Sequence, residues 1–72
     1  MRTYTVIERQ EGGQEQTILV SGPEQTALGA IDGRIANLKA RGFTHVRGSY
    51  AHGFLLTNCC GDTRNLAIRL LP

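Results

Sequence analysis

One stretch of this chain has the residue spacing of a long amphipathic helix, and it lies between Ser21 and Gly42. Its large apolar residues recur every three or four positions and predict a single buried stripe: Leu28, Ile31, Ile35 and Leu38. Ser21 and Glu24 fit a capping box at the helix start, with Pro23 in the first turn. Gly42 fits the left-handed residue that ends many helices. All other segments are short and punctuated by glycine, so this helix is the element that can cover a sheet.

Two segments before the helix, residues 2–9 and 14–20, alternate side chains with the period of two that is typical of β-strands. The loop at residues 11–13 fits a three-residue hairpin loop with Gly13 in its left-handed position. This register predicts three cross-strand pairs, one of them between opposite charges: Tyr4 and Val20, Val6 and Ile18, and Arg9 and Glu15.

Three further strands are expected after the helix, at residues 43–51, 54–58 and 64–71. Turns at residues 51–53 and 60–62, each containing glycine, would join them. The first of these turns sets a register with three notable pairs, the first facing the helix: Tyr50 and Phe54, Gly48 and Leu56, and His45 and Cys59.

The order of these segments predicts an α+β fold, ββαβββ: a single antiparallel or mixed five-stranded sheet with one helix packed on one face. Residues 1–72 are expected to form one domain. A domain of this length buries only about 60% of its unfolded surface, so dimerisation or a bound partner would add stability. No apolar run exceeds three residues, against roughly 20 for a membrane-spanning helix, so we expect a cytoplasmic protein with no membrane partner.

The face of the sheet turned away from the helix is expected to combine large aliphatic residues with arginines, as protein interfaces do. Its candidate partner-binding residues are Ile7, Leu19, Arg47, Leu55 and Arg69. The alternative is a solvated face with scattered apolar residues, which are common on protein surfaces.

Charge is distributed unevenly, because residues 1–32 are acidic on balance and residues 33–72 are basic. Seven of the eight basic residues are arginine, which suits paired contacts to carboxylate or phosphate groups. One interpretation is a nucleic-acid-binding protein that uses four basic residues, the first and third on the exposed side of the helix: Arg34, Lys39, Arg41 and Arg47. The pI of 8.8 lies below the value of about 9 that is usual for such proteins.

A ridge of small residues, Gly29, Gly33, Ala36 and Ala40, lies beside the apolar stripe of the helix. Glycine costs about 1 kcal/mol relative to alanine inside a helix, so two of them one turn apart suggest close approach by another backbone. That backbone belongs either to the sheet of the same chain or to a partner or second copy.

Residue types that carry catalysis or bind metals are few and are not arranged for either purpose. His45, His52, Cys59 and Cys60 do not have the spacing of a tetrahedral zinc site, and the adjacent cysteines are expected to be reduced thiols. No paired carboxylates stand on one element with the spacing that general acid–base catalysis needs. We therefore expect a protein that is not an enzyme and has neither a metal nor a cofactor.

The segment from Tyr4 to Gln10 resembles the first strand of a small anti-CRISPR protein, one of the inhibitors that phages and mobile elements encode. The helix and the glycine-rich hairpins are similar in order across nearly the whole chain. The resemblance implies a protein that occupies a surface of a CRISPR effector complex, often one that would hold DNA. Together with the residues above, it favours a protein-binding module that acts by surface occlusion; the alternatives are nucleic-acid binding and a homodimeric structural protein.

Overall fold

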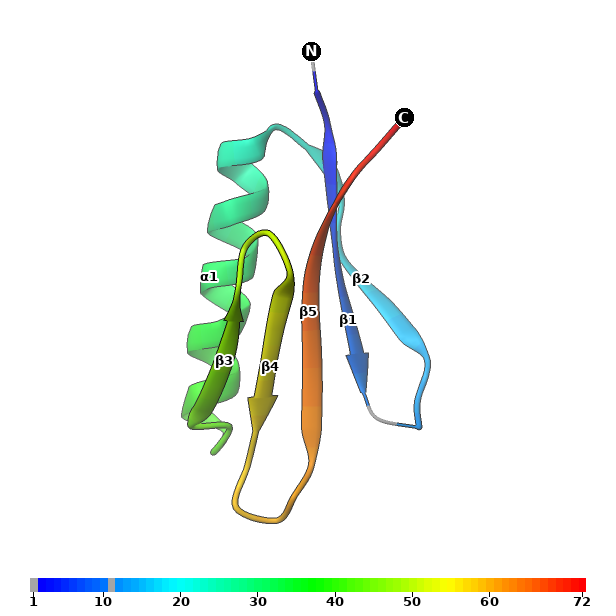
Figure 1. The fold of residues 1–72 in the computed structure, drawn as a ribbon. Helices are drawn as coiled ribbons and strands as arrows, with labels where there is room; N and C mark the ends of the chain where they lie inside the picture. Colours follow the sequence, from blue (N-terminus) through cyan, green and yellow to red (C-terminus); the bar gives the residue numbers. More distant parts are fainter. Residues whose placement is uncertain (1, 11) are drawn as a thin grey trace.

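A computed structural model describes residues 2–10 and 12–72 of the chain (Figure 1). Within that part, five strands and one helix follow one another in the predicted order: β1 (Tyr4–Gln10), β2 (Glu15–Gly22), α1 (Glu24–Ala40), β3 (His45–Ser49), β4 (Gly53–Thr57) and β5 (Thr63–Leu70). The strands form one sheet in the order β2-β1-β5-β4-β3, and every neighbouring pair is antiparallel. The α+β prediction is confirmed, and the sheet is antiparallel rather than mixed.

The helix begins three residues later than its predicted cap. Pro23 occupies the N-cap position, and no side-chain cap hydrogen bond forms there in the described chain. The predicted capping box is wrong because β2 extends to Gly22 and holds Ser21 in strand conformation. The helix end is as expected: Gly42 has a φ of +104°, and the Phe43 amide donates to the Leu38 carbonyl at 3.0 Å, which closes a Schellman motif.

The hydrophobic core lies between α1 and the face of the sheet that α1 covers. Its buried members come from the helix, the helix-facing strand positions and the segment after the helix: Val6, Ala27, Ile31, Leu38, Phe43, Leu56 and Leu66. Ile35 packs against this cluster, so three residues of the predicted apolar stripe pack where the sequence indicates. Each fully buried aliphatic side chain stabilises the fold by about 1.5–3 kcal/mol.

The hairpin of β1 and β2 keeps one predicted pair and changes the others. Arg9 lies opposite Glu15 as expected, but Val6 lies opposite Leu19 and Tyr4 opposite Gly22. The predicted pairing is wrong because β2 carries one extra residue at each of two register shifts.

The left-handed glycine in the loop of this hairpin also differs from the prediction. Gly12, with a φ of +72°, takes the left-handed conformation that we expected at Gly13. The first residue of the predicted loop, Glu11, lies outside the described residues.

The hairpin of β3 and β4 is offset by two residues from the predicted register. Gly48 lies opposite Phe54, and His45 lies opposite Thr57 rather than Cys59. An even offset keeps each strand residue on its predicted face, so Leu56 is still buried. Tyr50, however, falls in the loop, where it is exposed and its ring meets the edge of Phe54 at a centroid distance of 5.2 Å.

Candidate interaction surfaces

The face of the sheet opposite α1, here called the outer face, is covered by no element in the described part of the chain. Two shallow depressions of about 380 and 140 Å³ lie on it and share Asn65 and Ala67 of β5. Arg47 and Leu55 line the first depression. Because the two depressions meet at β5, they form one uneven surface across the middle of the sheet.

Aliphatic side chains lie at the centre of the outer face. Ile7 is only 8% exposed, and it lines the smaller depression. Leu55 lies two strands away and is 36% exposed. Ala67, half-buried, lies opposite Ile7 and also lines the larger depression. The outer face therefore has an apolar centre made of Ile7, Leu55 and Ala67.

Arginines flank this apolar centre. Arg69 and Arg9 both donate to Glu15 Oε1, at 3.2 and 3.1 Å, and both arginine side chains are largely exposed. Arg47 is exposed beside Leu55, and no described acceptor is paired with its side chain. Three of these four charged groups are arginines and one is a glutamate, so these groups give the outer face a net positive charge.

Leu19 does not belong to the outer face, although the sequence pattern placed it there. It lies opposite Val6 and packs against the hydrophobic core. The physical reason is the register shift between Thr17 and Leu19 of β2, since one inserted residue reverses the face of the residues beyond it. Of the five predicted partner-binding residues, four therefore share one face: Ile7, Arg47, Leu55 and Arg69.

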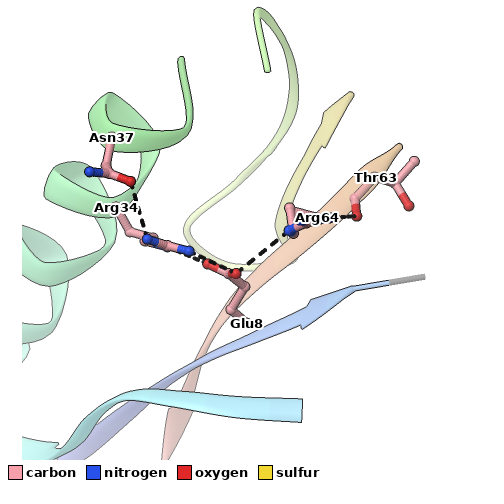
Figure 2. Close-up of polar contacts among 5 residues, drawn as sticks. All are labelled: Glu8, Arg34, Asn37, Thr63 and Arg64. Atoms are coloured by element: carbon pink, nitrogen blue, oxygen red, sulfur yellow. Dashed lines mark hydrogen bonds and ion pairs between the residues drawn. The ribbon is translucent and has the colours of Figure 1, made fainter. Parts of the chain in front are cut away.

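A second charged cluster lies on the helix-covered face, centred on Glu8 of β1 (Figure 2). Glu8 is only 4% exposed, and Arg34 of α1 holds it with two hydrogen bonds, Nε to Oε1 at 2.5 Å and Nη2 to Oε2 at 3.0 Å. Arg64 of β5 approaches Oε2 to 3.8 Å through its Nε. One buried carboxylate thus links the helix to two neighbouring strands.

Further contacts fix the two arginines of this cluster. Arg34 also donates to Asn37 Oδ1 at 3.2 Å. Arg64 donates to the Thr63 carbonyl at 3.1 Å, and its guanidinium lies 4.9 Å from the centre of the Phe43 ring. The hydrogen bonds from Arg34 to Glu8 raise the pKa of Arg34 above its ordinary value. Both guanidinium groups are therefore held in position by more than one contact.

The four predicted nucleic-acid-binding residues do not form one surface. Arg34 was expected on the exposed side of the helix, but it turns towards the sheet because the buried carboxylate of Glu8 needs a partner. Arg41 lines a pocket with Arg34 and Arg64 on the helix-covered face, whereas Arg47 lies on the outer face. Lys39 is exposed in the last turn of α1 and does not line that pocket.

Sequence reasoning missed Glu8 and Arg64 as members of a site. The available signal was a carboxylate at a helix-facing strand position, two residues after the buried Val6. A carboxylate in such a position needs a cationic partner.

The histidines and cysteines remain apart. Cys59 and Cys60 are exposed, free thiols in the loop between β4 and β5. No group of three or more histidine, cysteine or acidic residues that could hold a metal occurs among the described residues. The loop is organised instead by Asn58, whose side-chain oxygen accepts from the Cys60 and Asp62 amides, both at 2.9 Å.

The ridge of small residues on α1 faces solvent. Gly29, Gly33, Ala36 and Ala40 are all exposed, and a Cβ at either glycine would meet no described atom within 4 Å. The interpretation that the ridge lets the helix approach its own sheet is therefore wrong.

No helix in the described residues is long and apolar enough to cross a membrane. Comparison with protein-family models, with curated proteins and with solved structures found no match.

Proposed function

We propose that this protein is a small, non-enzymatic protein-binding module that acts by surface occlusion, with the outer face of its sheet docked on a partner. The observation that carries the proposal is the bare outer face itself, where Ile7, Leu55 and Ala67 lie between exposed arginines. An apolar centre combined with arginine, and a polar rim that water can reach, are typical of protein interfaces.

The charge of the outer face indicates the partner's chemistry. Arg47 has no described acceptor, and Arg9 and Arg69 share the single carboxylate of Glu15. A partner surface with carboxylates around an apolar patch would complement this arrangement and increase the association rate.

The narrower form of the proposal is an inhibitor of the anti-CRISPR type that works in the cytoplasm. It is supported by the resemblance of the first strand and of the element order, and by the small size of the chain. A module of this kind would occlude a surface of a CRISPR effector complex or of another nucleic-acid-handling complex.

Nucleic-acid binding through Arg34, Lys39, Arg41 and Arg47 is the weaker proposal, because Glu8 pairs with Arg34 and because Arg47 lies on the other face of the sheet. It predicts an affinity for oligonucleotides that falls steeply with salt. Absence of binding at low salt would reject it.

The decisive variant of the main proposal is Leu55→Glu, which places a carboxylate in the centre of the outer face. Its matched control is Leu70→Glu, because Leu70 is also a strand residue, is 55% exposed and lies opposite Tyr4 on the helix-covered face. Tagged protein would first be used to isolate nuclease-resistant partners from host lysate. Each purified partner would then be titrated with wild type and both variants.

We expect Leu55→Glu to weaken binding at least tenfold with unchanged circular dichroism, and Leu70→Glu to bind as wild type does. Equal binding by both variants would remove the outer face as the interface. Light scattering adds a further outcome: a dimer that Leu55→Glu dissociates would make a second copy the occupant of the outer face and reject occlusion of a foreign partner.

A further inference from the structure

A polar pocket of about 210 Å³ lies on the helix-covered side of the molecule, away from the outer face. It is built where three elements end together, and Figure 1 shows the C-terminal end of α1, the end of β1 and the start of β5 at the same end of the sheet. Arg34, Arg41 and Arg64 line it together with Glu8. Here the pocket is called the arginine pocket.

Charge in the arginine pocket is unbalanced. Glu8 is the one carboxylate among the described lining residues, and Arg34 occupies both of its oxygens. Three guanidinium groups against one carboxylate leave two positive charges without a counterion among these residues. Arg41, which is exposed, has no described hydrogen-bond acceptor for its side chain.

The arginine N–H groups in the pocket are hydrogen-bond donors of the kind that bind oxyanions. A guanidinium has five N–H donors. The contacts of Arg64 to Thr63 and Glu8 do not use all of them, so others remain for a ligand. The cation–π contact with the Phe43 ring restricts the guanidinium of Arg64, so less conformational freedom is lost when a ligand binds. Gln10, Gln14 and Gln16 add side-chain amides to the lining.

The size of the pocket limits the ligand. Pockets for drug-sized molecules usually span about 300–1,000 Å³, so this pocket fits a single anionic group. A phosphate monoester carries about −1.5 to −2 charges at pH 7 and offers three acceptor oxygens, which matches two unbalanced guanidinium charges.

We propose that the arginine pocket binds a phosphate group, free or as a monoester, with Arg41 and Arg64 as its direct ligands. Arg34 is the positioning residue, because its contacts to Glu8 hold the helix end over the strands. The negative end of the α1 dipole lies at the same pocket and opposes anion binding. Binding therefore depends on both guanidinium groups, so loss of Arg41 alone is expected to weaken it at least tenfold.

The test is calorimetric titration of the full chain at constant ionic strength with inorganic phosphate, sulfate and acetate. The variant is Arg41→Gln, and its matched control is Arg47→Gln, which removes another exposed arginine, on the outer face. We expect phosphate and sulfate to bind, acetate to bind at least tenfold more weakly, and Arg41→Gln to lose at least tenfold in phosphate affinity. Arg47→Gln should bind as wild type does.

Acidity provides a second readout. Phosphate loses its second charge below about pH 6, so its affinity should fall there, while sulfate stays doubly charged and should hold its affinity. Equal loss in the two arginine variants, equal affinity for acetate and phosphate, or no phosphate binding by wild type would each overturn the proposal.

A further comparison distinguishes which kind of molecule carries the phosphate group. Glycerol phosphate, a 5′-phosphorylated oligonucleotide and the same oligonucleotide without its terminal phosphate would be titrated in parallel. Binding of the first two but not the third supports recognition of the terminal group itself. Equal binding of the two oligonucleotides without binding of glycerol phosphate would overturn the proposal in favour of general backbone binding. None of these results depends on the outer face, so they leave the proposed function to its own test.

Discussion

Arg34 and Glu8 join the helix to the sheet through two hydrogen bonds between a guanidinium and a nearly buried carboxylate. The two residues are 26 positions apart in the chain, and they meet where the hydrophobic core gives way to the arginine pocket. The pair therefore both fixes the position of α1 and determines the charge of the pocket.

Replacing Glu8 should destabilise the fold strongly. Glu8→Ala leaves two arginines without a carboxylate, and we expect the free energy of unfolding to fall by about 3 kcal/mol, the low end for breaking a buried pair, because both arginines keep some solvent contact. Urea denaturation followed by circular dichroism measures the change. Glu15→Ala is the matched control, since its exposed partners predict a loss below about 1 kcal/mol. Equal losses in the two variants would show that burial of Glu8 adds nothing.

Gly48 should tolerate no side chain. Its φ is +116°, and a Cβ would lie 2.1 Å from the Gly53 carbonyl oxygen, so Gly48→Ala must push β3 away from β4. We expect a loss of about 2 kcal/mol or more in unfolding free energy, from strain and lost pairing. Hydrogen exchange should localise the change to β3 and β4. A melting temperature equal to that of wild type would contradict the local geometry.

Gly29 should behave in the opposite way. It lies on the exposed side of α1, and a Cβ added there would have no described atom within 4 Å, so Gly29→Ala adds helix propensity without a clash. The expected gain is about 0.5–1 kcal/mol in unfolding free energy, measured by urea denaturation. If the ridge is a partner contact instead, the same variant would be stabilised and yet lose partner binding, which titration of the purified partner would detect.

The order of the elements along the chain and the faces of the strands were more predictable than the registers. Alternation placed Val6 and Glu8 on the helix side and Ile7 on the outer side, because a period of two depends on local pattern alone. The extra residue in β2 between Thr17 and Leu19 has no local signal, and it moved Leu19 from the outer face to the core. At β3 and β4 the left-handed residue Gly53 begins the strand instead of ending the loop, which displaced the register by two.

The charged cluster could be predicted only in part. Glu8 at a helix-facing position signals a buried carboxylate that needs a cation, but seven arginines were available in the sequence. The choice of Arg34 and Arg64 depends on how α1 crosses the sheet and on the pairing of β1 with β5. Both are features of the tertiary structure, which the local sequence pattern does not show. The same limit hid the arginine pocket, whose lining comes from four separate parts of the chain: β1, the start of β2, α1 with its C-cap, and β5.

Tyr50 provides a pH-dependent prediction. Its hydroxyl donates to Asp32 Oδ1 at 2.5 Å, and this hydrogen bond is the main cause that raises the pKa of Tyr50 above its ordinary value. A raised pKa in the folded state means that the contribution to stability is fully present below the unfolded pKa of about 10 and is lost as pH rises through the folded value. The contact therefore holds the β3–β4 loop against α1 at neutral pH and releases it in alkali.

Ultraviolet titration at 295 nm in a Tyr4→Phe background follows the ionisation of Tyr50 alone, since the chain has two tyrosines. We expect a midpoint above pH 10, and we expect Asp32→Asn to lower it, because the amide lacks the negative charge that opposes phenolate formation. Asp62→Asn is the control, since Asp62 bonds to Asn58 in the β4–β5 loop and should leave the midpoint unchanged. Identical midpoints with and without Asp32 would mean that the hydrogen bond does not persist in solution.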